Sequence, residues 1–246
     1  MCGRFVSASP PDQIARYFDA EVPETALDPS YNVAPTDDVY VVRSDGGTRR
    51  VTPVHWGLVP YWAKDPSVGN RMINARADTL ASKGAFKPSF QNRRCLVPAD
   101  GFYEWKAVPG QKVKQPVFIH PADGGQFAFA GLWAVWRDPG ASPAELEAGG
   151  GRLRSCTIIT GDPNDKVAPI HDRMPVILPR SAWDTWLDPE LHDLDVLAEL
   201  LVAAPASSID LHPVSTEVNN VRNGGAHLLD PVPELTGEVP GQATLL

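Results

Sequence analysis

Short apolar runs rich in β-branched and aromatic residues are the feature that most constrains how this chain can fold. They are separated by Gly, Pro and Asp, which are frequent in turns and rare inside strands. Such runs occupy residues 38–44, 49–57, 94–106, 115–121, 126–136, 153–160 and 174–179. Their length and punctuation are typical of β-strands. The chain is therefore predicted to fold mainly as β-sheet.

Helical patterns are fewer and lie at the margins of this region. Residues 9–18 can begin a helix with proline in its first turn, and Ile14, Tyr17 and Phe18 share one face of it. Further helices are predicted between residues 181 and 203. Many short strands with few helices predict an α+β fold. In it, a curled or barrel-like, mixed antiparallel sheet is flanked by short helices.

The predicted domain organisation is one folded unit with two irregular segments. A chain of 246 residues, 43% of them hydrophobic, can bury one large core, which we place at residues 2–222. Residues 138–152 interrupt two strong strand patterns and are expected to form a mobile insertion. Residues 223–246 are acidic and broken by Pro and Gly, so we expect a disordered tail there.

Composition excludes several classes of protein. No apolar run is long enough to cross a bilayer. The cysteines Cys2, Cys95 and Cys156 form no CxxC pair, which argues against a disulfide framework and a zinc site. We therefore expect a cytoplasmic monomer without metal, other cofactor or membrane partner. The net charge of −8 does not indicate a general polyanion binder, but local basic patches can still bind nucleic acid.

The opening residues MCGRF place a cysteine directly after the initiator methionine. If Met1 is removed, as a small second residue generally permits, Cys2 carries both a free α-amine and a thiol. Such an aminothiol can condense with an aldehyde, after which the tethered sulfur closes a five-membered thiazolidine. The reference pKa of an N-terminal amine is about 7.7–8.0, so more of it is neutral and nucleophilic at pH 7 than of a lysine.

Other polar stretches interrupt the strand pattern, and each has an ordinary explanation. Asn74, in NRMINARADTL, could cap a following helix. Glu104, in ADGFYEWK, could face water from an alternating strand. His171, in IHDRMP, could be a loop histidine with satisfied hydrogen bonds. Taken singly, none of these residues indicates a function.

Longer motifs together point to a family. MCGRF, YNVAPT, WGLVPYWAKD, INARADT, RCLVPADGFYEWK, FAGLW, CTIITGDPN and IHDRMPVIL follow one another between Cys2 and Val221. This pattern resembles the SOS response-associated peptidase family, or SRAP domain. The resemblance implies a β-rich α+β fold with a DNA-binding groove. It also implies a protein that binds abasic sites in single-stranded DNA and links itself to the sugar through its N-terminal cysteine, on the nucleoid when bound.

The resemblance also assigns roles to individual residues. It places the catalytic positions at Cys2, Asn74, Glu104 and His171. We interpret Glu104 as an acid with a raised pKa that opens the sugar ring, His171 as a second acid or base, and Asn74 as a group that orients Cys2.

The predicted DNA contacts are arginines and tryptophans. The arginines that match phosphate-contacting positions, where a guanidinium can bind bidentately, are Arg4, Arg76 and Arg173. The tryptophans that could stack on bases are Trp56, Trp62 and Trp105. Packing in the core is the alternative for each tryptophan.

Two other functions use the same residues. An N-terminal nucleophile peptidase would use the amine of Cys2 as the base for its own thiol and cleave amide bonds in itself or other proteins. A DNA-binding module without catalysis would leave Cys2, Glu104 and His171 without a task. Arg76 and Arg173 favour the DNA-linking interpretation, because a phosphate-contacting pair has no evident role in amide cleavage. A Schiff base without ring closure could also give a side activity as an abasic-site lyase.

Overall fold

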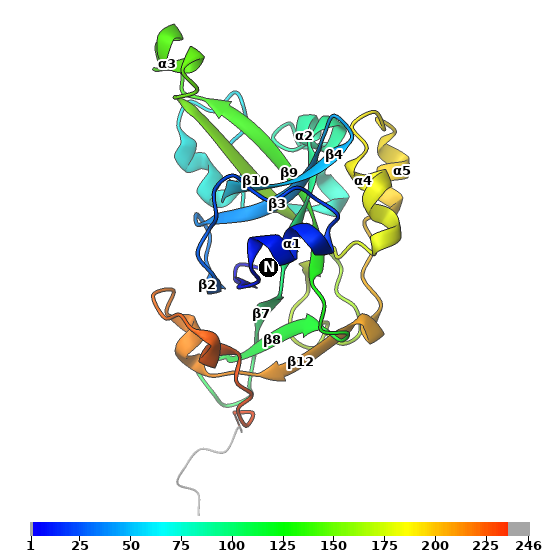
Figure 1. Cartoon of the computed structure of the whole chain (residues 1–246). Helices are drawn as coiled ribbons and strands as arrows, with labels where there is room; N and C mark the ends of the chain where they lie inside the picture. The colour runs from blue at the N-terminus through cyan, green and yellow to red at the C-terminus, as the bar shows by residue number, and fades with distance from the viewer. Residues whose placement is uncertain (1, 236–246) are drawn as a thin grey trace, which may run out of the picture.

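Two sheets and a few short helices make up the computed structural model, which describes residues 2–235 (Figure 1). The seven-stranded sheet contains β3 (Asp38–Asp45), β4 (Thr48–Trp56), β5 (Asn74–Arg76), β6 (Arg94–Ala99), β9 (Phe127–Arg137), β10 (Arg152–Gly161) and β11 (Met174–Pro175). The five-stranded sheet contains β1 (Phe5–Ser7), β2 (Ser30–Val33), β7 (Gly101–Lys106), β8 (Gln115–Pro121) and β12 (Ile209–Pro213). These strands coincide with most of the predicted runs.

The larger sheet closes into a barrel. Its strands follow in the order β10, β4, β3, β6 and β9, and β9 then pairs again with β10. That last pairing runs from Arg137 opposite Arg152 to Gly131 opposite Ile158. Most pairs are antiparallel, whereas β10 pairs in parallel with β4 and with β5. The prediction of an α+β fold with a barrel-like, mixed sheet is confirmed.

Alternation along the strands separates two cores. On β3, Val39 and Val41 belong to a cluster that joins the barrel to the smaller sheet and includes Cys2. Tyr40 and Val42 belong to a second cluster that joins the barrel to the helices. Because successive side chains point to opposite faces of a strand, one apolar run can serve both cores.

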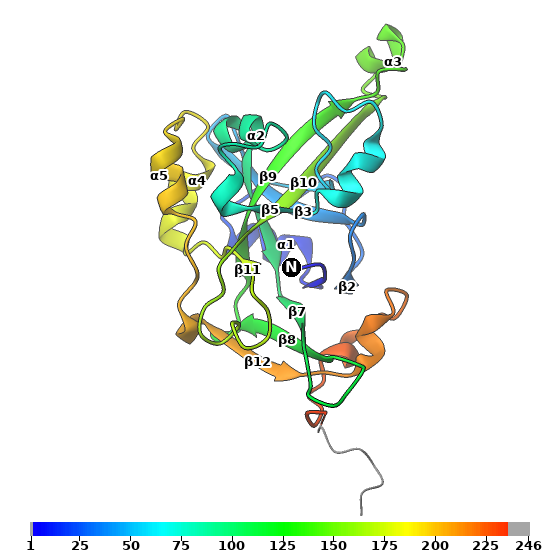
Figure 2. The same ribbon diagram turned by 180° about the vertical axis from the view of Figure 1, so that it is seen from behind.

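Helices cover one flank of the barrel. They are α1 (Pro11–Tyr17), α2 (Lys87–Asn92), α4 (Trp183–Leu187) and α5 (Leu194–Glu199), and α4 and α5 lie side by side in both views (Figures 1 and 2). Short 3₁₀ helices connect the rest: η1 (Pro66–Arg71), η2 (Ala77–Thr79), η3 (Arg180–Ala182), η4 (Ala206–Ser208), η5 (Thr216–Asn219) and η6 (Ala226–Leu229). No helix within residues 2–235 is both long and apolar enough to cross a membrane.

The two irregular segments differ in how they contact the domain. Residues 138–151 form the tip of the β9–β10 hairpin and carry α3 (Pro143–Glu147), which begins with a capping box made by Ser142 and Glu145 (Figure 1). Residues 223–235, assigned above to the tail, pack on the domain instead. Leu228 is fully buried there, and Pro231 forms a β-bridge with Val214. Residues 236–246 lie outside the described residues, so the prediction for them stays a prediction.

Arg94, on β6, ties the helices to the barrel. It is 5% exposed, and its guanidinium donates to the backbone carbonyls of Phe90, Gln91, Trp186, Asp188 and Leu191. These carbonyls include the ends of α2 and α4 that a short helix leaves without partners. One buried side chain therefore satisfies backbone groups from two distant segments of the chain, residues 90–91 and 186–191.

Replacing Arg94 should destabilise the fold strongly. Arg94→Met leaves several buried carbonyls without donors, and we expect the free energy of unfolding to fall by about 3 kcal/mol or more. Urea denaturation measures this change, with Arg16→Met as the control because Arg16 is exposed on α1 and should change stability by less than about 0.5 kcal/mol. Equal midpoints for the two variants would contradict the role given to Arg94.

Candidate active site

The pairing of two strands in the smaller sheet brings Cys2 beside Glu104. β1 and β7 are antiparallel, with Phe5 opposite Phe102. Continuing this register toward the N-terminus brings Gly3 opposite Glu104, because antiparallel partners advance in opposite directions. Burial, and then the nearby charge of Glu104, raises the pKa of the Cys2 thiol. The two side chains are therefore within electrostatic reach of each other.

Asn74 contacts Cys2 from the larger sheet. β5 runs parallel to β10, which places Asn74 opposite Ile158, and the Nδ2 atom of Asn74 donates to the carbonyl oxygen of Cys2 over 2.7 Å. The other amide atom, Oδ1, is buried and has no hydrogen-bond partner among residues 2–235. A buried acceptor of this kind can receive a hydrogen bond from a ligand that enters the site. Asn74 can thus orient both the cysteine and a bound molecule.

Glu104 is buried in the sheet, with only 2% of its surface exposed. Burial raises the pKa of this carboxyl group from its ordinary 4.5 to about 7, because the ionised form loses its hydration. Of the charged side chains nearby, Lys114 lowers this pKa and Asp172 raises it. Both protonation states are populated near neutral pH, so Glu104 can give or take a proton.

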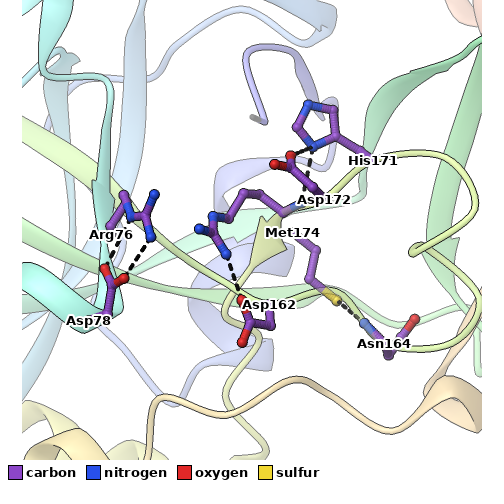
Figure 3. A network of polar contacts seen from close by, with 8 residues as sticks. Arg76, Asp78, Asp162, Asn164, His171, Asp172 and Met174 are labelled. Carbon is purple, nitrogen blue, oxygen red and sulfur yellow. Dashed lines mark hydrogen bonds and ion pairs between the residues drawn. The ribbon is translucent and has the colours of Figure 1, made fainter.

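His171 lies in the loop before β11, close to the same charges. Its Nδ1 atom is 3.0 Å from the backbone nitrogen of Arg173 and 2.9 Å from Oδ1 of Asp172 (Figure 3). Burial lowers the pKa of the imidazole, while Asp172 raises it. In the neutral ring Nδ1 accepts the Arg173 N–H and Nε2 carries the proton, and the contact with Asp172 becomes an ion pair only on protonation.

Arg76 and Arg173 line one pocket of about 350 Å³, and each is held by a carboxylate. Nε and Nη2 of Arg76 donate to Asp78 over 3.1 and 2.6 Å, and Nη1 of Arg173 donates to Asp162 over 2.5 Å (Figure 3). Strand β10 organises the pocket, because Thr160 lies opposite Arg76 in the parallel pair with β5. The geometry suits an anion, which would replace the carboxylates.

Arg4 has structural partners. Its Nη1 donates to Oδ1 of Asn32 over 2.7 Å and to the carbonyl of Val218 over 2.8 Å. Its guanidinium carbon lies 5.9 Å from the centre of the Trp105 ring. Arg4 therefore ties the N-terminal strand to a segment near the other end of the described chain, and its contact with a phosphate stays a prediction.

The tryptophans occupy different environments. Trp56 is fully buried, its Nε1 donates to the Ile73 carbonyl, and its ring packs edge-on against Phe5. The expectation that Trp56 stacks on a base is therefore wrong, because the ring is enclosed in the core. Trp62 is 53% exposed, and Trp105 is half-buried with Nε1 bonded to Asn219. For these two, base stacking stays a prediction.

The described part of the chain contains no candidate metal site. No group of three or more His, Cys, Asp or Glu side chains within residues 2–235 could hold a metal ion. Cys95 and Cys156 are free and buried in the cluster that contains Cys2. Burial raises the pKa of both thiols, so they stay protonated at neutral pH.

Comparison with known proteins decides the family. The sequence model of the SOS response associated peptidase (SRAP) family matches residues 1–221. The chain belongs to the SRAP family. It is similar to the abasic site processing protein YoqW of Bacillus subtilis, with 41% identity covering 94% of this chain and 99% of the relative. The abasic site processing protein YedK of Escherichia coli is 34% identical, with coverages of 94% and 100%.

A solved structure supports the same fold. The crystal structure of a protein from Bacteroides thetaiotaomicron superimposes with a TM-score of 0.81 at 23% identity, covering 94% of this chain and all of the other. The β-rich SRAP architecture is thus present here. Within it the structure brings Cys2, Asn74 and Glu104 together, while His171, Arg76 and Arg173 lie on the segments that flank the end of β10.

Several charged residues of this SRAP protein were not found from the sequence. Lys114 and Asp172 influence the pKa of both Glu104 and His171, and Asp78 and Asp162 hold the two arginines. Asp78, Asp162 and Asp172 stand inside the motifs INARADT, CTIITGDPN and IHDRMPVIL. Their position inside the motifs could have marked them, but sequence alone does not distinguish an aspartate that pairs with an arginine from one that only contacts solvent. Lys114 lies in a loop outside these motifs, and no pattern marks it.

The raised pKa of Glu104 predicts a pH-dependent stability. The pKa is higher in the folded protein than in the unfolded chain, so its contribution is complete below about pH 4.5 and is lost as the pH rises through 7. Glu104→Gln, which does not titrate, should therefore gain stability relative to the parent protein as pH rises. The gain should reach roughly 3 kcal/mol at high pH. Urea denaturation between about pH 5 and pH 8 measures this difference.

Glu145→Gln is the matched control. Hydrogen bonds from Ser142 hold the pKa of Glu145 below its ordinary 4.5, so this carboxyl is ionised in both the folded and the unfolded chain over the range measured, and the stability of Glu145→Gln relative to the parent protein should change little between about pH 5 and pH 8. If the difference for Glu104→Gln stays constant over this range, Glu104 does not titrate near neutrality in the folded protein.

Proposed function

We propose that this SRAP protein processes abasic sites in single-stranded DNA by forming a covalent thiazolidine with the sugar through Cys2, after removal of Met1. The observation that carries the proposal is a buried carboxyl group with a pKa of about 7 next to an N-terminal cysteine. The names of the relatives, abasic site processing proteins, support the choice of substrate.

The reaction requires proton transfers in both directions. The abasic sugar is mostly a closed ring, and protonation of its ring oxygen by Glu104, with loss of the proton of the anomeric hydroxyl, releases the aldehyde. The amine of Cys2 adds to that aldehyde, and the resulting carbinolamine takes up a proton and loses water to give an iminium ion. The thiol sulfur then bonds to the same carbon, and its proton passes to the Glu104 carboxylate. A single group with a pKa near 7 can serve both steps, because each of its forms is abundant at neutral pH.

The state of the thiol supports this order of steps. Burial raises the pKa of the Cys2 thiol, so the sulfur is protonated before reaction and is a weak nucleophile. The amine therefore attacks first, and the sulfur reacts only when an electrophilic carbon stands beside it. The same protonated thiol counts against a peptidase mechanism, which needs the thiolate to attack an amide.

The remaining residues position the DNA. Asn74 holds the Cys2 carbonyl and has a buried acceptor for a sugar hydroxyl. The neutral His171 ring is a second proton donor through Nε2. Arg76 and Arg173, in their common pocket, provide guanidinium groups for phosphates beside the lesion.

Blocking the N-terminal amine tests the proposal. A variant with residues added before Cys2 should give no stable adduct with an abasic oligonucleotide, because an amide nitrogen is not nucleophilic. Cys2→Ser should likewise fail, whereas Cys156→Ala, which removes another buried thiol, should retain the adduct. Denaturing electrophoresis and intact mass with peptide mapping detect it. Attachment of the sugar to any residue other than Cys2 would overturn the mechanism.

Removing the carboxylate that holds Arg173 should strengthen binding to DNA. Asp162→Asn frees the guanidinium for a phosphate, and exposed ion pairs are worth about 0.2–1 kcal/mol. Affinity for an undamaged single strand should therefore rise up to about fivefold at low salt, and Arg173→Ala should reduce it. Fluorescence anisotropy measures both.

Asp12→Asn is the matched control, because it releases an exposed arginine, Arg16, from an ion pair on α1. Its affinity should equal that of the parent protein. A similar gain for Asp12→Asn and Asp162→Asn would show that only net charge matters.

A further inference from the structure

A second basic surface lies at the other end of β10 from the pocket of Arg76 and Arg173. It is a groove of about 1170 Å³ between the β9–β10 hairpin, β4 and the end of α2. Figure 1 shows this hairpin projecting from the barrel, with α3 at its tip. The charged residues that line the groove are Arg93, Arg137, Arg152, Arg154 and Asp38, and His55 also lines it.

The arginines of this groove differ from those of the first pocket. Among residues 2–235, no carboxylate lies in ion-pair contact with Arg93, Arg137, Arg152 or Arg154, whereas Arg76 and Arg173 are both paired. Four guanidinium groups and one carboxylate leave the groove strongly positive in a protein whose net charge is −8. Charge concentrated in a cleft attracts a polyanion despite an opposite net charge, because distant charges are screened.

Aromatic rings accompany these charges. The guanidinium of Arg93 lies 5.7 Å from the centre of the Trp133 ring, with Arg43 on the same ring at 5.4 Å. This contact limits the conformations of Arg93. Tyr61 also lines the groove and is 66% exposed. Proteins that bind single-stranded nucleic acid combine such groups, because arginines bind the phosphates and exposed aromatic rings stack on the bases.

Strand β10 connects the groove with the candidate active site. Arg152 and Arg154 share a face of the strand with Cys156, since side chains alternate. Cys156 belongs to the core cluster that contains Cys2, and two residues of strand span only about 7 Å. From Arg154 to Thr160, at the first pocket, β10 spans about 20 Å.

We propose that this groove binds the phosphate backbone of the DNA strand on one side of the abasic site, while Arg76 and Arg173 bind phosphates nearer the lesion. This assignment rests on the proposed function, and it adds a flanking site that sets which side of the lesion must carry an extended strand. Affinity then depends on strand length on that side and is indifferent to length on the other.

The test uses oligonucleotides with a tetrahydrofuran analogue of the abasic site, which has no aldehyde and cannot cross-link. One oligonucleotide carries about twelve nucleotides only on the 5′ side of the analogue, and another carries the same length only on the 3′ side. Fluorescence anisotropy gives the affinity of the parent protein, of the double variant Arg152→Ala/Arg154→Ala and, as an independent probe of the groove, of Arg137→Ala. These arginines are exposed, so thermal unfolding should be almost unchanged.

The double variant should lose about tenfold in affinity for one of the two oligonucleotides at about 50 mM salt, and keep its affinity for the other. The slope of log affinity against log salt should fall by about 1.4, or about 0.7 for each phosphate that an arginine no longer neutralises. Arg137→Ala should show a smaller loss on the same side. The double variant Arg16→Ala/Arg180→Ala removes the same charge from the opposite flank and should change neither affinity.

Two results would overturn the assignment. An equal loss for both oligonucleotides would mean that the arginines act only through general charge. No loss for either would mean that the groove serves another partner, such as an acidic protein. The proposed function is tested separately, by the adduct of the parent protein with a true abasic site. That reaction should proceed at the parent rate in the double variant when DNA is saturating.

Discussion

The hydrogen bonding of β10 is the constraint on which the rest of the structure depends. This strand pairs with β4, β5, β9 and β11, so it both closes the barrel and fixes the segments that carry polar residues. Asn74 and Arg76 are set beside it by the parallel pair with β5, and Arg173 directly precedes the strand that pairs with its end. A shift of β10 by one residue would exchange its two faces, and would separate Asn74 from Cys2. The candidate active site and both basic surfaces are therefore consequences of one register.

The second constraint is the burial of the N-terminal segment between the two sheets. Cys2 and Phe5 belong to the core, and β1 adds to the smaller sheet beside β7. Burial explains the chemical state of the site, because the same loss of hydration raises the pKa of both the Cys2 thiol and the Glu104 carboxyl. The packing that forms the core thus also sets the pKa values of the reactive groups.

Much of the fold follows from patterns that are local in sequence. The strands alternate between two cores, and the helix at Pro11–Tyr17 has its apolar face where spacing placed it. A barrel-like sheet was predicted, but the pairs that close it were not, because the pairing of β9 with both β6 and β10 depends on distant segments. The short helix α2 was not predicted, since tertiary contacts with Arg94 and the barrel stabilise it.

The sequence indicated which residues form the site, but not how deeply each of them is buried. Glu104 could be named from its motif, yet the alternation of its strand also fits a solvent-exposed side chain, and only the folded structure shows that it is buried. For Trp56, both base stacking and core packing were open, because sequence does not reveal which face of a strand is covered. Residues 223–235 pack on the domain through Leu228, which is buried, and through Leu229, which contacts a buried cluster, although the composition of the segment resembles a free tail.

Asp78 and Asp162, which pair with Arg76 and Arg173, must give way when another anion binds in the first pocket. A phosphate entering it displaces a carboxylate instead of water alone, so each new ion pair replaces an existing one. On our proposal, this exchange weakens binding to intact strands and shortens the time that the protein stays on them. The N-terminal cysteine, on the same proposal, reacts only once. Rapid dissociation from intact strands therefore leaves unreacted molecules free to bind an abasic site.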